Sequence, residues 1–141
     1  MDYQKVGQGN RNSQGGCGLA TLIFLIFAAF VETDKVCFSN GTDWQTTPVE
    51  GYTNVSSNFT HMLWGLTITS ALSAIIPIAG TIHIGYFIWM AIAIFSEAGK
   101  LCTEHVLSAR GTFMLIYFWL NIALTACVCL AVCALVALKG R

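Results

Sequence analysis

The residues that could carry chemistry in this sequence are six cysteines, three histidines and a few polar groups within apolar stretches. No nucleophile elbow, phosphate-binding glycine loop or His-Glu-x-x-His zinc motif occurs. Glu97, Glu104 and His105 are close in sequence, but without a paired base or nucleophile they are typical of a solvated connector. We therefore expect a protein that is not an enzyme and uses no cofactor.

The cysteines have different expected roles. Cys37 and Cys102 lie in polar segments, and an oxidising compartment would favour a disulfide between them. Cys17 begins the first apolar segment and is a candidate for S-palmitoylation, or simply a small residue that lipid tolerates. The other three share the last apolar segment: Cys127, Cys129 and Cys133. Since that segment lacks histidine and carboxylate, we expect no metal site there.

Three glycosylation sequons occur in the polar segment of residues 32–61. They are Asn40-Gly41-Thr42, Asn54-Val55-Ser56 and Asn58-Phe59-Thr60. A threonine-rich loop can contain idle sequons, but three in one segment favour a loop that faces the lumen or the cell exterior. Asn58 is very near the next apolar stretch, so Asn40 and Asn54 are the better acceptors.

The composition indicates an integral membrane protein. Apolar residues make up 55% of the 141 residues and charged residues only 10%, whereas a water-soluble domain carries about 25% charge. Seven basic and seven acidic residues cancel, which argues against a nucleic-acid partner because such binding needs a basic surface. The high apolar content argues against a disordered chain.

Charge-free stretches define the expected membrane helices. They are residues 17–31, 62–95 and 112–138. A hydrocarbon core about 30 Å thick needs about 20 apolar residues in a helix. The first stretch is short, but Glu32 and Lys35 can extend to the interface beyond it. A cleaved signal peptide is the alternative, and we favour an uncleaved anchor because Phe30-Val31 offers no small-residue cleavage pair.

The middle stretch is too long for one crossing. As a single helix it would measure about 51 Å, which exceeds even a strongly tilted span. Pro77 removes a backbone donor and two glycines follow within eight residues, so we predict a hairpin. Its helices are residues 62–78 and 84–98, joined by a turn at 79–83. The alternative is one proline-kinked span, which gives three crossings instead of four.

The expected fold is therefore an all-α membrane protein with a bundle of four transmembrane helices. A flexible cytosolic tail at 1–16 precedes a single bundle at 17–141. Its outer loops are 32–61 and 99–111, and its last helix is 112–138. The plan is similar to that of small tetraspan membrane proteins such as the MARVEL and claudin types. The likeness is architectural, because the first loop has one cysteine and lacks the claudin Gly-Leu-Trp signature.

Small residues recur at four-residue intervals in two of the expected helices. The two series are Gly65, Thr69 and Ser73, and Ala123, Cys127 and Ala131. Small side chains let membrane helices approach closely, either within this chain or with a partner.

Two polar residues interrupt the apolar stretches. Asn121 lies near the middle of the last helix, where a buried amide needs a partner, and we expect it to bond across helices to a threonine or serine of residues 67–73. His83 falls in the predicted turn of the hairpin.

The leading expectation is a small multi-pass membrane glycoprotein that organises, traffics or modulates partner membrane proteins. Its environment is the bilayer of the secretory pathway or plasma membrane, with the N-terminus in the cytosol and a partner membrane protein or a second copy beside it. The alternative is a transporter or channel subunit that acts through Asn121 and His83.

Overall fold

The computed structural model describes the backbone of residues 11–73 and 75–140, and the side chains of that part from residue 18 onward. This part of the chain is mostly helical, which agrees with the expected all-α class. The helices are α1 (Arg11–Phe30), α2 (Val55–Ser73), α3 (Pro77–Phe95), α4 (Glu97–His105) and α5 (Ser108–Lys139). The strands are β1 (Phe38–Ser39), β2 (Trp44–Gln45) and β3 (Thr53–Asn54).

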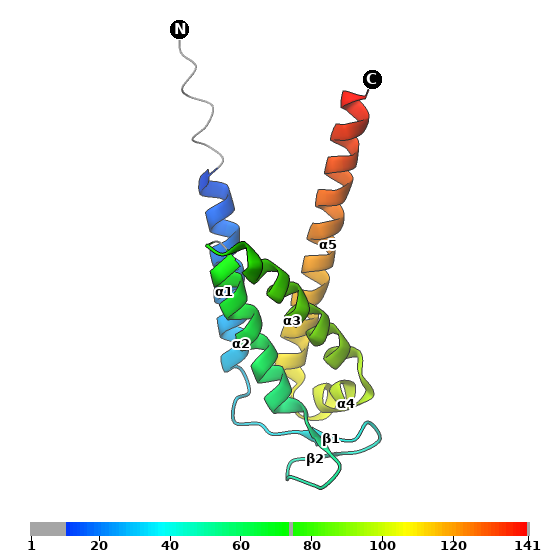
Figure 1. The fold of residues 1–141 in the computed structure, drawn as a ribbon. Helices are drawn as coiled ribbons and strands as arrows, with labels where there is room; N and C mark the ends of the chain where they lie inside the picture. The colour runs from blue at the N-terminus through cyan, green and yellow to red at the C-terminus, as the bar shows by residue number, and fades with distance from the viewer. Residues whose placement is uncertain (1–10, 74, 141) are drawn as a thin grey trace.

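Helices α1, α2 and α5 run roughly along one direction, α3 crosses them obliquely, and the small elements lie at one end (Figure 1). Figure 1 shows the start of α1 and the end of α5 at one end of the molecule, and the strands and α4 at the other. We call the end with the strands and α4 the loop end. The strands form an antiparallel sheet in the order β2-β1-β3. Helix α5, with 32 residues, extends well past the connection between α2 and α3 (Figure 1).

The chain reverses between α2 and α3 as the hairpin prediction requires, but at a different place. Helix α2 ends at Ser73 and α3 begins at Pro77, so residues 79–83 lie within α3 and not in the turn. Proline is favoured in the first turn of a helix, because its missing N–H would have no intrahelical acceptor there. Pro77 therefore starts a helix here, and the chain does not continue as one kinked helix.

Helix α2 also begins earlier than expected, at Val55 instead of residue 62. The Asn54 side-chain oxygen accepts hydrogen bonds from the Ser57 backbone N–H (2.9 Å) and the Ser56 hydroxyl (2.8 Å). An asparagine in this position satisfies donors that the first turn of a helix leaves free. The first loop is accordingly shorter than the predicted segment of residues 32–61.

The second loop contains a helix that the sequence analysis did not predict. Ser96 ends α3 and caps α4, because its hydroxyl donates to the Ala93 carbonyl (2.7 Å) and accepts from the Gly99 N–H (3.0 Å). Most of the predicted loop at 99–111 is thus α4 and the first turn of α5.

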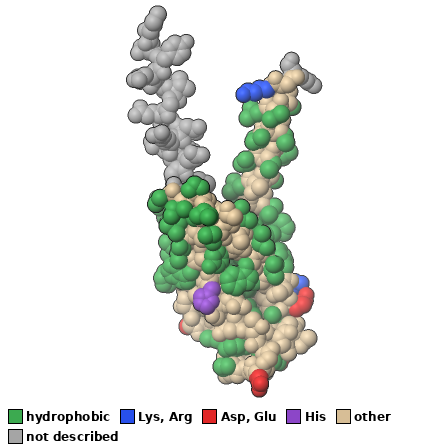
Figure 2. Space-filling model, viewed as in Figure 1, with side chains coloured by type: hydrophobic (Ala, Val, Ile, Leu, Met, Phe, Trp, Pro, Cys, Tyr) green, Lys and Arg blue, Asp and Glu red, His purple; other side chains and the backbone are tan. Residues whose placement is uncertain are grey.

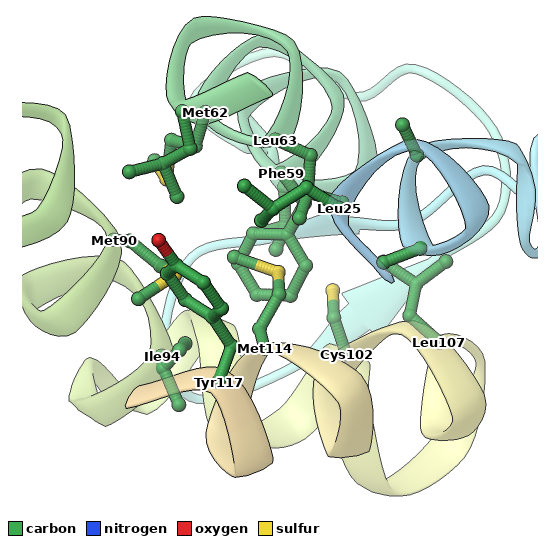
Figure 3. Close-up of a cluster of buried hydrophobic side chains, with 14 of the residues drawn as sticks. Leu25, Phe59, Met62, Leu63, Met90, Ile94, Cys102, Leu107, Met114 and Tyr117 are labelled. Atoms are coloured by element: carbon green, nitrogen blue, oxygen red, sulfur yellow. The ribbon is translucent and has the colours of Figure 1, made fainter. Parts of the chain in front are cut away.

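The buried core lies in the half of the molecule nearest the loop end. All five helices contribute to it, and Figure 3 shows their side chains converging on one cluster. Its labelled members are Leu25, Phe59, Met62, Leu63, Met90, Ile94, Cys102, Leu107, Met114 and Tyr117. Because α1 to α5 meet here, this cluster holds the elements of the loop end together.

The other half of α5 is exposed along its whole length. Every residue from 122 to 140 is exposed, and the exposed side chains include Leu124, Val128 and Leu135. Its first turn lines a cavity shared with α3. Figure 2 shows the apolar side chains on the walls of the helices and the acidic ones near the loop end. Such a distribution is unfavourable in water and suits a surrounding of lipid.

Two described helices are long and apolar enough to cross a membrane, namely Pro77–Phe95 and Ser108–Lys139. Only 17% of the most apolar window of the first is buried, and none of that of the second. A core helix of a soluble protein would be mostly buried instead. A shorter apolar helix runs from Gly18 to Phe30.

Candidate functional site

Arg110 is a fully buried cation at the loop end, with an exposed fraction of 1%. It lies in the first turn of α5, and its side chain reaches two other helices. Its Nε donates to the Val31 carbonyl at the end of α1 (2.9 Å). Its Nη1 donates to the Thr60 hydroxyl (2.9 Å) and the Ser56 carbonyl (3.4 Å) in α2. One guanidinium group therefore joins α1, α2 and α5.

Glu32 makes the reciprocal contact from α1 to α5. Its Oε2 accepts a hydrogen bond from the Arg110 backbone N–H (2.9 Å), and its Oε1 accepts one from Lys35 Nζ (2.6 Å). A carboxylate at a helix N-terminus satisfies free N–H groups and the positive end of the helix dipole. Glu32 has a left-handed backbone (φ 57°) just after α1. We call Glu32, Arg110, Val31, Ser56 and Thr60 the polar clamp.

These contacts shift the pKa of the Glu32 carboxyl group. Burial by itself would raise the pKa of Glu32, but the hydrogen bonds from the Arg110 backbone and from Lys35 outweigh burial. The pKa of Glu32 is therefore lower than its ordinary value. The folded clamp favours the ionised carboxylate.

The predicted disulfide between Cys37 and Cys102 is present beside the clamp. It links Cys37, the residue before β1, to α4 across 65 residues, with the two Cα atoms 5.9 Å apart. The Cys37 carbonyl also accepts a hydrogen bond from the Val55 N–H (2.9 Å), and the Cys37 N–H donates to the Ser56 hydroxyl (3.3 Å). Cys37 thus connects the first loop both to the start of α2, by hydrogen bonds, and to α4, by the disulfide.

Neither Glu32 nor Arg110 was recognised from the sequence as a site residue. The one sequence feature that could have indicated a role for Arg110 is its position, two residues before a long charge-free stretch and in a segment with a cysteine. That position also fits a solvated charge at a membrane surface, so burial could be seen only in the folded chain.

His83 lies inside the bundle and not in a turn at its edge, which corrects the sequence prediction. Its Nδ1 is 2.9 Å from the Thr69 hydroxyl of α2, and its Nε2 is 3.3 Å from the Tyr117 hydroxyl of α5. The Thr69 hydroxyl donates to the Gly65 carbonyl (2.7 Å), so it is assigned as the acceptor for Nδ1–H. Nε2 then accepts from Tyr117, and a neutral imidazole satisfies every hydrogen bond.

Asn121 does not bond to the serines and threonines of α2 as expected. Its amide Nδ2 donates to the Tyr117 carbonyl of its own helix (2.8 Å), and its backbone carbonyl accepts from the Thr125 hydroxyl (2.8 Å). Asn121, His83 and Thr125 line a cavity of about 160 Å³ between α3 and α5. Among the described residues, His83 is the one ionisable group in that lining.

The two series of small residues have different surroundings. Gly65 packs against the ring of Tyr86 in α3, where a Cβ atom would overlap the ring carbons. Thr69 binds His83 as described, whereas Ser73 is exposed and donates to the Ser70 carbonyl of its own helix. The residues of the second series are exposed on the far half of α5: Ala123, Cys127 and Ala131. Gly65 and Thr69 thus pack within the chain, whereas Ser73 and the second series are exposed.

The three sequons are not equivalent in the folded chain. Asn40 is exposed, and its Oδ1 accepts from the backbone N–H (3.0 Å) and hydroxyl (2.9 Å) of Thr42. Asn54 is the cap of α2 and is half-buried. Asn58 lies within α2 and lines a cavity of about 230 Å³. Asn40 is therefore the sequon whose side chain is most accessible.

The remaining four cysteines lie in the first and the last helix. The backbone of Cys17 lies in α1, but its side chain is outside the described residues. Of the predicted flexible tail at 1–16, residues 1–10 also lie outside the described part, whereas residues 11–16 are helical and begin α1. The free cysteines of the described chain are exposed on α5: Cys127, Cys129 and Cys133. No group of three or more histidine, cysteine or acidic residues is placed to hold a metal in the described part.

The chain was also compared with known proteins. No protein-family model, curated protein or solved structure matches it. The function is therefore inferred from the geometry of the chain itself.

Replacing Glu32 with glutamine should reduce the dependence of stability on pH. Because the pKa of Glu32 is lower in the folded chain, its ionised form stabilises the fold above the unfolded pKa of about 4.3. That stability is lost as the pH falls through the folded pKa. We expect thermal unfolding in detergent between pH 7 and 3 to show a smaller fall for Glu32→Gln than for the unchanged chain. Glu97→Gln is the exposed control, and an undiminished fall in Glu32→Gln would show that this carboxylate does not stabilise the fold.

Replacing Arg110 with methionine should strongly destabilise the loop end. The change removes the donors to Val31, Ser56 and Thr60, and each buried acceptor left unpaired costs about 1–3 kcal/mol. Lys100→Met removes only an exposed ion pair with Glu97 and should cost less than about 1 kcal/mol. Denaturant unfolding of the purified chain measures both. Equal stabilities of the two variants would show that the clamp contributes little.

Proposed function

We propose that this chain is a small multi-pass membrane glycoprotein without catalytic activity, which organises, traffics or modulates partner membrane proteins. We place it in the secretory pathway or plasma membrane, with four crossings, cytosolic termini, and its loop end in the lumen or outside the cell. The observation that carries the proposal is the far half of α5, which is apolar and exposed along its length.

The polar clamp supports the proposed number of crossings. Val31, Thr60 and Arg110 meet at one end of the molecule, so the chain between Thr60 and Arg110 must leave that end and return to it. Helices α2 and α3 make this excursion. If α5 crosses a bilayer from the loop end, then α1 crosses it toward the loop end, and both termini share the opposite side.

The hydrogen bonding of α2 supports its place in a bilayer despite its polar residues. The hydroxyl of Thr67 donates to the Leu63 carbonyl, and that of Thr69 to the Gly65 carbonyl, both at 2.7 Å. Polar groups are tolerated in hydrocarbon when they are bonded inside the protein. Helix α2 has 19 residues and is about 28 Å long at 1.5 Å per residue, of which the first turns, with Ser56 and Thr60, lie in the polar clamp at the loop end.

We propose a role without catalysis because the polar residues of the bundle form hydrogen bonds or a disulfide within the chain. Arg110 donates hydrogen bonds within the polar clamp, and both ring nitrogens of His83 form hydrogen bonds to neighbouring helices. The disulfide uses Cys37 and Cys102. Each of these groups thus has a structural partner, and the surface left for function is the apolar wall of α5.

A glycan should attach at Asn40. Asn40 lies in the exposed first loop and its sequon threonine is already oriented toward it, so translation of the full chain into microsomes should give a glycosidase-sensitive shift. We expect Asn40→Gln to remove this shift. Asn58→Gln should retain the shift, because Asn58 lies in α2 and is half-buried. An unglycosylated chain that is otherwise inserted would contradict the placement of the loop end.

Transport is the second candidate, because the cavity beside His83 and Asn121 places two polar groups between α3 and α5. The two roles are distinguished by proton flux from the purified chain in vesicles that contain a trapped pH-sensitive dye. The proposed role gives the same flux as empty vesicles. Flux above that level which is lost in Asn121→Leu, but kept in the control Thr112→Val at the other end of α5, would favour a transporter.

A further inference from the structure

A cavity of about 230 Å³ lies at the loop end between the end of α3, helix α4 and the start of α5. It has an apolar part and a polar part. The apolar part is formed by Ile94, Phe95 and Leu115, and the polar part by Lys100, Thr103 and Glu104. No element of the described chain fills it.

The position of the cavity matches a membrane boundary. One candidate span ends at Phe95 and the other begins at Ser108, and the cavity lies between these two ends. Helix α4 connects them, with Gly99 and Cys102 buried and Lys100 and Glu104 exposed. The apolar part of the cavity therefore adjoins the hydrocarbon, and its polar part adjoins the headgroup layer.

The charges at the cavity are one cation and one anion on the same face of α4. Lys100 and Glu104 are one helical turn apart. The Lys100 ammonium contacts only the exposed Glu97 carboxylate at 3.1 Å, and it keeps further donors for an anion. Glu104 is exposed and has no ion pair in the described chain. This arrangement complements a ligand that carries both a phosphate and an ammonium group.

Thr103 also lines the cavity, between the charged and the apolar residues of its lining. Its side chain packs against the backbone of Gly111 in α5, where a Cβ atom would overlap it. This close contact of α4 with α5 forms the floor of the cavity.

We propose that this cavity binds one zwitterionic glycerophospholipid from the bilayer leaflet at the loop end. Lys100 contacts the phosphate, Glu104 contacts the headgroup ammonium, and the start of an acyl chain lies against Phe95 and Leu115. An anionic lipid fits less well, because Glu97 and Glu104 outnumber Lys100 on α4. This inference rests on the proposed membrane placement, but it does not depend on the proposed role toward partner proteins.

The test uses the full chain with its disulfide intact in nanodiscs of phosphatidylcholine and phosphatidylserine in equal amounts. Native mass spectrometry counts the lipids that remain bound after release from the discs. We expect one retained phosphatidylcholine, with about five-fold less retention in Glu104→Gln, the effect of about 1 kcal/mol. Glu97→Gln is the matched control, since Glu97 lies on the same helix and does not line the cavity.

A second pair of variants separates loss of the site from loss of folding. Thr112 lines the cavity and is exposed, so Thr112→Trp should fill it and abolish retention without disturbing the core. Ile116→Trp places the same ring on an exposed position of α5 outside the lining and should retain the lipid.

Three results would overturn the inference. Equal retention by Glu104→Gln and Glu97→Gln would show that the carboxylate has no part in binding, and preferential retention of phosphatidylserine would show the wrong headgroup class. If the unchanged chain is recovered in nanodiscs without bound lipid, the inference fails but the membrane placement stands. If the chain cannot be inserted into a bilayer at all, both fail together.

Discussion

The buried guanidinium group of Arg110 determines how the rest of this chain is arranged. It holds the end of α1, the start of α2 and the start of α5 at one point, and the Cys37–Cys102 disulfide fixes α4 beside them. With these segments joined, the stretch between Thr60 and Arg110 has to fold back on itself. The hairpin of α2 and α3 agrees with this constraint, and the proposed four crossings and the proposed common side of the two termini rest on it.

The clamp surrounds a buried cation with oxygen atoms from neighbouring elements. A buried cation is costly unless its donors are hydrogen-bonded, and Arg110 donates from Nε and Nη1 to carbonyl and hydroxyl oxygens at the end of α1 and in α2. Its Nη2 has no hydrogen-bond partner among the described residues. The planar fork of arginine suits several acceptors at once, as a lysine ammonium does not. Glu32 in turn caps the helix that carries Arg110. The polar clamp lies at the loop end, and the walls of the helices beyond it are largely apolar (Figure 2).

The sequence was sufficient to predict the coarse plan, because that plan depends on the positions of charges. The charge-free stretches indicated the long helices, and the two polar segments correctly placed Cys37 near Cys102. The turn was misplaced because Pro77 is as acceptable at the start of a helix as at a break. That shift moved His83 from a turn to the bundle interior. Burial of Arg110 and capping by Asn54 depend on contacts between distant residues, which no local pattern contains.

The orientation of the two termini is the most direct test of the constraint that Arg110 imposes. Distinct epitope tags before Met1 and after Arg141 can be followed in sealed microsomes treated with protease from the cytosolic side. We expect both tags to be digested while the segment with Asn40 is protected. Digestion of the first tag with full protection of the second would mean an odd number of crossings, which is incompatible with a clamp that closes a hairpin of two membrane helices.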